Sequence, residues 1–360
     1  MDGEQSAADG RGARARVRAV QPHTDASAPH AAASDAGRRR VLVLAAASTL
    51  LWACSGNGEA VLVDGEKVAP EVIDKDPLAL LPSGAIMVSR LDAQAMFRSG
   101  FGADAARLIA NLIPLGPESG FVASRDLTTL HGGLYAMQGA DFCMVAQGNF
   151  DRDAIQRAAD ARAVTVAGMP LVKSHYAGFD LYTAGNVGFV VLTSRTALSG
   201  NETGMRRALD RLRFSKLERS QPEWAIKLLE TQNASFAVAG DLTTQPGAAA
   251  VAASSLPFVA GLHYLRVIGN FQPPGVNFAG ALTYGDAQQA AAGAAALANV
   301  RSFAAMMSLV TVLFGGSIPN MQVAQSGSDV AFTLPLDDRL MRLLLGRVID
   351  ATRPGALPAR

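Results

Sequence analysis

The chain has 360 residues, of which 49% are hydrophobic and 18% are charged, and this composition excludes a disordered chain. It supplies enough apolar material for one large or two moderate globular domains. The formal net charge of +1 lacks the basic excess that nucleic-acid-binding proteins need, so nucleic acid is not an expected partner.

The first signal along the chain is a basic cluster, Arg38 to Arg40, followed by the apolar run 41–50. A charged segment before an apolar segment too short to span a bilayer comfortably is typical of an export signal peptide. The run leads directly into Leu51, Trp52, Ala53 and Cys54. The alternative interpretation is a single membrane anchor or a buried helix in which the cysteine is incidental.

These four residues resemble the lipobox of bacterial lipoproteins, and the outline is similar to envelope lipoproteins of GC-rich Gram-negative bacteria, a resemblance that assigns no activity. It implies that the Cys54 thiol carries a diacylglycerol and that the chain is cut before it. Two or three acyl chains make a stable anchor without a membrane span. Ser55, rather than Asp, implies sorting to the outer membrane. Residues 1–53 are therefore an N-terminal extension and signal peptide.

The exported part begins with residues 54–80, which we interpret as the lipidated cysteine, a flexible tether and a small hairpin at 61–68. The Asp64-Gly65 pair supplies the positive φ angles of a two-residue hairpin turn. The main body is expected to begin near Leu81.

From there the same order of elements is predicted twice, in residues 81–219 and in residues 220–350, with 351–360 as a disordered tail. Strands at 85–91, 133–137 and 142–148 correspond to strands at 235–242, 264–268 and 277–283, and two later hairpins, at 179–193 and 321–334, also correspond. Asp151 and Asp286 each precede a helix. The predicted fold is α+β, with two tandem repeats of a small antiparallel sheet and helices packed on one face.

No sequence motif with mechanistic content is present, so no enzyme, cofactor or metal site is predicted. His131, His175 and His263 are too few and too far apart for a predicted zinc site. Asp92 and Asp241 follow equivalent strands and, like Asp151 and Asp286, are interpreted as caps or turn residues rather than as acids and bases. Cys143 lies in an apolar run and is interpreted as a buried hydrophobic residue.

The most suggestive feature is a long helical segment, 287–314, which is apolar on nearly every side. Such a helix is buried in a core, forms the wall of a cavity for an apolar ligand, or inserts into lipid. The candidate cavity wall consists of Met306, Met307, Val310 and Phe314.

The sequence therefore predicts a lipid-anchored protein of the cell envelope that acts as a non-catalytic structural or interaction module, with the membrane and an envelope protein as partners. The first alternative is a periplasm-facing carrier of a lipid or other apolar ligand. The second is an enzyme. A filled core favours the module, an open apolar cavity favours the carrier, and a polar cleft with His131 or His263 beside Asp favours the enzyme.

Overall fold

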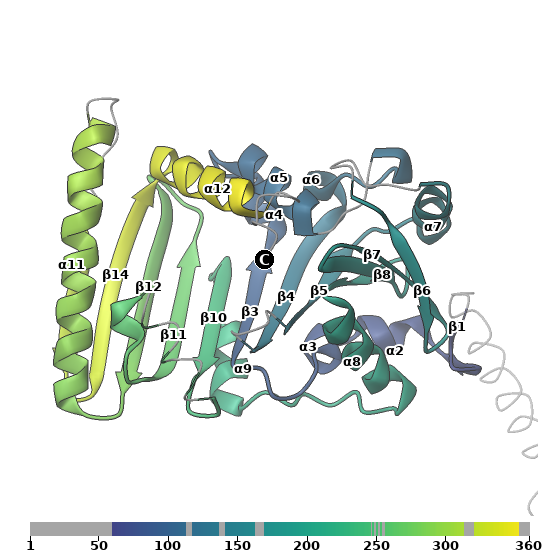
Figure 1. The fold of residues 1–360 in the computed structure, drawn as a ribbon, viewed down its shortest axis with the longest axis horizontal. Coiled ribbons are helices and arrows are strands. Elements are labelled where there is room, and N and C mark those ends of the chain that lie inside the picture. Colours follow the sequence, from purple (N-terminus) through teal and green to yellow (C-terminus); the bar gives the residue numbers. More distant parts are fainter. Residues whose placement is uncertain are drawn as a thin grey trace, which may run out of the picture. The chain divides into compact units, whose positions relative to one another are not determined.

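In the computed structural model, residues 60–352 are described apart from 113–116, 137–140, 163–168, most of 246–255 and 313–319. Side chains at 110–112, 117, 136, 300–312 and 351–352 are not described. The described chain forms a 12-stranded sheet, in the order β13-β14-β12-β11-β10-β3-β4-β5-β9-β8-β7-β6, and every neighbouring pair is antiparallel (Figure 1). Strands β1 (Val61–Val63) and β2 (Glu66–Val68) form a separate hairpin. The prediction of a mixed α+β fold built on antiparallel strands is confirmed.

The first half of the sheet contains seven strands. They are β3 (Met87–Asp92), β4 (Leu127–Ala136), β5 (Asp141–Gly148), β6 (Val172–Tyr176), β7 (Phe179–Ala184), β8 (Val187–Val191) and β9 (Thr196–Gly200). The second half contains β10 (Phe236–Asp241), β11 (Leu262–Asn270), β12 (Gly275–Tyr284), β13 (Gln322–Ser326) and β14 (Asp329–Asp337).

The two halves meet where β3 pairs with β10. Outward from this pair, one side runs β4, β5, β9, β8 and the other runs β11, β12, β14, β13. By position in the sheet, the β13–β14 hairpin corresponds to the pair β8 and β9. The repeat pattern in the sequence predicts β7 and β8 as its counterpart instead. The sequence pattern does not predict strand β9. Its five residues are all buried and show no alternation of polar and apolar side chains.

Helices cover both faces of the sheet, so the prediction of helices on one face is wrong. Buried side chains alternate between faces: Val145 packs with the cluster under α8, and the next residue, Ala146, packs with the cluster on the other side. A strand that is apolar on both sides needs cover on both sides. We name the two surfaces the α8 face and the α12 face.

The α8 face is covered by four helices, which are α2 (Pro70–Asp74), α3 (Pro77–Leu80), α8 (Glu202–Arg213) and α9 (Glu223–Leu229). The α12 face is covered by α4 (Ala93–Phe97), α5 (Gly102–Leu112), η1 (Pro117–Ser119), α6 (Ala123–Asp126), α7 (Arg152–Asp160), η2 (Pro257–Val259), α11 (Ala287–Val312) and α12 (Asp338–Thr352).

Residues 61–80 belong to the folded body and are more than a tether. Val61, Ile73 and Leu80 are buried in the same cluster as the first-half strands. The predicted hairpin forms, with Asp64 and Gly65 at φ angles of 50° and 87°. The core therefore begins at β1.

The described first part of α11 is buried along one side only. Ala290, Gly293 and Leu297 are buried, whereas Ala291 and Ala295 are exposed. This part of the helix is thus not buried on every side. Its exposed side chains are alanines, whose small methyl groups cost little free energy when they face water. Within the residues described, the structure contains no helix that combines the length and hydropathy needed to cross a membrane.

Candidate binding surface

Among the described residues, none covers the α8 face over the outer strands of the second half. On this face Ala279 and Ala281 of β12 lie beside Thr333 and Ala331 of β14, as the register shows. Neither pair is buried. In the first half, the same face is closed by α3 and α8 over Cys143, Val145 and other buried residues.

The cause is a difference in where the final helix of each half packs. Helix α8, after β9, packs on the α8 face, whereas α12, after β14, crosses to the other face, where Met341 and Leu345 pack near Phe101 and Val276. Figure 1 shows α12 running along the top of the molecule, away from α8 and α9. No helix of the described part of the chain therefore lies on that side of β12, β13 and β14.

The last cover on the α8 face is Trp224 of α9. Its ring meets Tyr264 of β11 edge to face with a centroid distance of 5.6 Å, and the Arg266 guanidinium lies 5.4 Å from the Trp224 ring centroid. Small side chains follow from β12 outward. This aromatic and cationic group therefore marks the border between the covered and the uncovered sheet.

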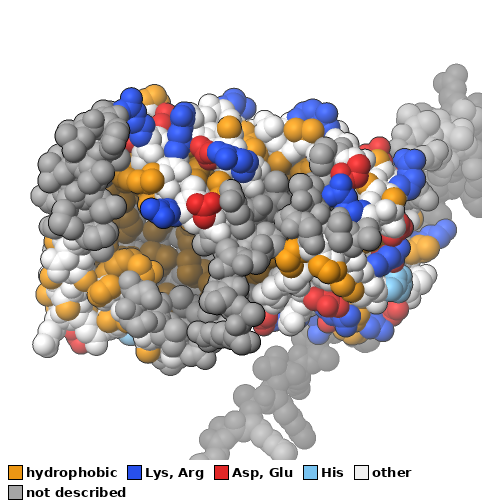
Figure 2. Space-filling view, turned by 45° about the horizontal axis from the view of Figure 1, so that its top comes forward, with side chains coloured by type: hydrophobic (Ala, Val, Ile, Leu, Met, Phe, Trp, Pro, Cys, Tyr) orange, Lys and Arg blue, Asp and Glu red, His pale blue; other side chains and the backbone are white. Residues whose placement is uncertain are grey.

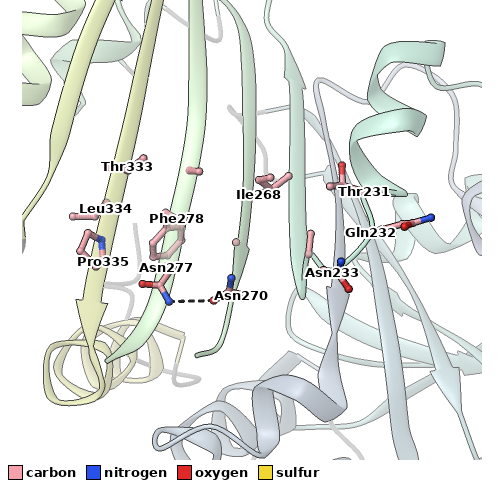
Figure 3. Close-up of a pocket in the computed structure, with 13 residues that line it drawn as sticks. Thr231, Gln232, Asn233, Ile268, Asn270, Asn277, Phe278, Thr333, Leu334 and Pro335 are labelled. Carbon is pink, nitrogen blue, oxygen red and sulfur yellow. Dashed lines mark hydrogen bonds between the residues drawn. The ribbon is translucent and has the colours of Figure 1, made fainter. Parts of the chain in front are cut away.

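A hollow of about 360 Å³ lies on the uncovered part. Figure 3 shows its lining side chains arriving from β11, β12 and β14 on one side and from the loop after α9 on the other. The lining contains Thr231, Gln232, Asn233, Ala234, Ile268, Gly269, Asn270, Asn277, Phe278, Ala279, Thr333, Leu334 and Pro335. A volume of this size is in the range of small-molecule sites.

The chemistry of this hollow is uncharged. None of its lining residues is ionisable, and the polar groups are amides and hydroxyls. The Asn277 Nδ2 atom donates to Asn270 Oδ1 and to the Gln272 carbonyl oxygen, both at 3.1 Å. Such a surface can hold an extended peptide through amide hydrogen bonds, or a neutral apolar group by contact, but none of its lining side chains is ionisable.

The α12 face is also hollowed over the second half. Figure 2 shows hydrophobic side chains in the floor of a hollow in the left part of the view. On this face Phe278, Phe332 and Leu334 are half-buried rather than buried. This hollow with a hydrophobic floor is the feature of the structure that favours the carrier hypothesis.

The three histidines lie apart. His131 is on β4 and His263 on β11, with β3 and β10 between those strands. His263 is exposed, and His175 is exposed with its Nδ1 atom 3.1 Å from Asp180. Among the described residues no group of His, Cys, Asp and Glu is arranged to hold a metal ion.

His131 is the buried member of the three, with 6% of its surface exposed, and it lines none of the hollows described above. Burial, together with the nearby Arg90 charge, lowers its pKa to about 4, so the ring is neutral at pH 7. Its Nδ1 atom has no hydrogen-bond partner within the described part of the chain. A ring that is buried and neutral at pH 7 is accounted for as part of the folded core.

The structure assigns structural roles to the acidic pairs. The carboxylates of Asp92, Asp151 and Asp286 accept backbone hydrogen bonds at helix starts, and Asp241 accepts from Thr243 in a turn. The capping interpretation is confirmed. Cys143 is fully buried, and burial raises the pKa of its thiol to about 12, which agrees with its interpretation as a buried hydrophobic residue.

Several predicted positions lie outside the described residues. These are the lipobox Leu51, Trp52, Ala53 and Cys54, the residue Phe314, and the side chains of Met306, Met307 and Val310. The uncovered α8 face was not predicted. The available signal was the run of Ala and Thr at alternate positions of 279–283 and 331–333, which fits no helix-covered strand.

The fold and site together define an α+β protein with a long antiparallel sheet. In the residues that the structure describes, this sheet is covered on both faces in its first half and bare on one face in part of its second. No family model and no curated protein matches the chain. Three solved structures of TP0453 are similar. Crystal form III is 12% identical, with 75% of this chain and 98% of that chain covered and a TM-score of 0.49. Form I is 11% identical, with 75% and 97% covered and a TM-score of 0.46, and form IV is 12% identical, with 75% and 96% covered and a TM-score of 0.45.

Proposed function

We propose that this chain is a lipid-anchored protein of the cell envelope, held in the outer membrane of a Gram-negative bacterium, and that it acts as a non-catalytic interaction module. The anchor rests on the basic and apolar run that ends at Leu51, Trp52, Ala53 and Cys54. The interaction role rests on one structural observation, the α8 face left bare over β12 and β14. Its partner is an envelope protein that presents an extended, uncharged segment.

The anchor is tested by the substitution Cys54→Ser. The thiol is the only acceptor for the diacylglycerol, so the variant loses labelling by a fatty-acid probe and accumulates as unprocessed precursor. Cys143→Ser is the matched control and keeps both labelling and processing. Equal labelling of Cys54→Ser and wild type refutes the anchor.

The contact surface is tested by photo-crosslinking in cells. A crosslinking amino acid at Thr333 is expected to give a product of defined mass, and the second change Ala279→Arg removes that product because a charged side chain then occupies the hollow. The same amino acid at exposed Glu71 of α2 is the control and gives no such product. A product that survives Ala279→Arg contradicts this use of the surface.

We also propose that the two halves arose by duplication. The same outward strand order on both sides of the β3–β10 pair supports this, as do Asp151 and Asp286 at the starts of α7 and α11. The additional hairpin of β6 and β7 and the opposite placement of α8 and α12 are then later differences between the halves.

The alternative function is a carrier of a lipid or other apolar ligand, favoured by the hydrophobic floor of the hollow on the α12 face (Figure 2). Native mass spectrometry of the purified chain tests it. A carrier retains lipid, and the changes Met307→Ala and Val310→Ala weaken that retention with little change in the melting temperature. In a module with a filled core, the same changes cost about 1 to 5 kcal/mol each, and no lipid is retained.

A further inference from the structure

The C-terminal end of α8 carries an exposed aromatic ring between two cations. Phe214 follows the last residue of the helix and is 58% exposed. The Arg213 guanidinium carbon lies 5.5 Å from its ring centroid, and the Lys216 Nζ atom lies 5.9 Å from it. A single exposed apolar side chain is common on protein surfaces, so the distinguishing feature of Phe214 is the pair of cations beside its ring.

More positive charge surrounds this ring. A shallow hollow of about 190 Å³ beside Phe214 is lined in part by Arg207, Arg211 and Lys216. The guanidinium groups of Arg207 and Arg211 donate to the carbonyl oxygens of Ser83 and Ala79, both at 2.7 Å. No acidic side chain within the described residues forms a salt bridge with these three cations. We name Arg207, Arg211, Arg213, Phe214 and Lys216 the Phe214 cluster.

Two acidic side chains lie at the cluster, and both are engaged. Asp64 lies 2.9 Å from the Arg213 guanidinium, and Asp210 accepts a hydrogen bond of 2.6 Å from the Tyr176 hydroxyl. Four cations stand against these two carboxylates, so the cluster keeps an excess of positive charge, and Arg213 and Lys216 are its solvent-exposed cations. Its complement is a surface that is both negative and apolar.

The position of the anchor identifies that surface. Asp64 is the turn residue of the β1–β2 hairpin, and β1 begins at Val61, seven positions after Cys54. Seven residues span at most about 25 Å even when fully extended. The salt bridge from Asp64 to Arg213 ties this hairpin to the Phe214 cluster. A lipid on Cys54 thus holds the bilayer within reach of the cluster, while Leu62, 53% exposed on β1, adds apolar surface on the same hairpin.

We propose that the Phe214 cluster is the surface on which the folded body rests against the bilayer, with its cations on the headgroups of anionic phospholipids and the Phe214 ring in the interface. This rests on the proposed anchor at Cys54. Basic residues near an anionic membrane attract it, and one apolar ring with several cations gives a weak, reversible contact. The anchor supplies attachment, and the cluster fixes which side of the body faces the lipid.

The test is co-sedimentation of the chain from Ser55 to Arg360, which keeps the whole folded body and omits the basic and apolar run before Cys54, with vesicles of 70% phosphatidylcholine and 30% phosphatidylglycerol. Binding is expected to these vesicles and not to pure phosphatidylcholine, and to weaken with salt. Arg213→Gln with Lys216→Gln lowers the vesicle affinity about 25-fold, since each cation contributes about fivefold. Phe214→Ala weakens binding with no change in net charge.

Two control variants separate this surface from general effects. Arg195→Gln with Arg347→Gln removes two exposed cations elsewhere and is expected to bind as wild type does. Leu343→Ala with Leu344→Ala removes the exposed leucines of α12, each 45% exposed, and is also expected to bind normally. Circular dichroism confirms that each variant is folded.

Equal losses in the cluster and charge-control variants overturn the proposal, because binding then follows net charge alone. Loss in the α12 variant with normal binding of the cluster variants also overturns it, because α12 is then the membrane contact. So does equal binding to both vesicle types. The anchor is tested separately, by fatty-acid labelling at Cys54. Different results therefore refute the two proposals.

Discussion

The Thr196 hydroxyl, fully buried at the start of β9, donates a hydrogen bond of 2.7 Å to the carboxylate of Asp74 at the end of α2. The same carboxylate oxygen accepts a hydrogen bond of 2.6 Å from the buried Thr193 hydroxyl, and the Asp74 carbonyl oxygen accepts from the Gln147 side chain at 3.0 Å. One residue of the N-terminal segment therefore satisfies three polar groups of the first-half sheet.

Asp74→Ala is expected to lower the free energy of unfolding by about 1 to 3 kcal/mol, because it leaves two buried hydroxyl donors without their acceptor. Urea unfolding of the Cys54→Ser chain measures the loss. Glu66→Ala, which removes an exposed carboxylate from β2, is the control and is expected to change stability by less than about 0.5 kcal/mol. Equal effects of the two substitutions would show that α2 does not hold the sheet.

Gly293 and Gly346, each within a helix, are expected to respond in opposite directions to alanine. A Cβ atom on Gly293 of α11 would lie too close to the Tyr284 hydroxyl oxygen, which itself donates to the Phe258 carbonyl oxygen at 2.6 Å. Gly293→Ala should therefore cost about 1 to 3 kcal/mol despite the better helix propensity of alanine.

Gly346 of α12 has open space where a Cβ atom would stand. Gly346→Ala should stabilise the protein by about 0.5 to 1 kcal/mol, since only the helix propensity changes. Thermal melts of both variants measure these changes: the melting temperature should fall for Gly293→Ala and rise for Gly346→Ala. A stabilised Gly293→Ala variant would contradict the close packing of α11 on Tyr284.

The buried His131 makes stability depend on pH. Its pKa is about 4 in the folded protein, below its ordinary value of 6.5, because burial and the charge of Arg90 disfavour the protonated ring. The neutral ring therefore stabilises the fold fully above pH 6.5, and this contribution, roughly 3 kcal/mol, is lost as the pH falls from 6.5 to 4.

His131→Leu should remove this part of the pH dependence, so the difference in unfolding free energy between variant and wild type changes steadily across that window. Urea titrations at pH 7.0, 5.5 and 4.5 measure the difference. His175→Gln, at an exposed site, should leave the pH dependence as it is in wild type. Parallel curves for His131→Leu and wild type would contradict the lowered pKa.

Cys143 should resist alkylation in the folded protein. Its thiol is fully buried and its pKa is raised to about 12 by burial, so the reactive thiolate is scarce at pH 8. In the Cys54→Ser chain it is the one remaining thiol. Mass spectrometry after iodoacetamide treatment should show unmodified protein in buffer and complete modification in urea. Rapid modification in buffer would mean that β5 opens readily.

Local patterns in the sequence predicted many of the elements. Asp151 and Asp286 indicated helix starts because a cap requires only the residue and the next turn. The Asp64-Gly65 pair indicated a hairpin for the same local reason. Strands such as β5 and β12 were recognised from their apolar content. The lipobox at Leu51 to Cys54 is likewise a local signal, and it remains a prediction.

Only the tertiary structure decided which surfaces are covered. Nothing in the residues of α12 dictates that it crosses to the face opposite α8, because that choice depends on contacts with α5, far away in the sequence. The same applies to Asp74, whose carboxylate binds two threonines that lie 119 and 122 positions further on. The alternation of side chains indicates that a strand has an apolar side. Whether that side is covered depends on which other element packs against it. The bare α8 face of β12 and β14 and the junction of Asp64 with Arg213 both depend on such long-range packing, which local sequence patterns do not encode.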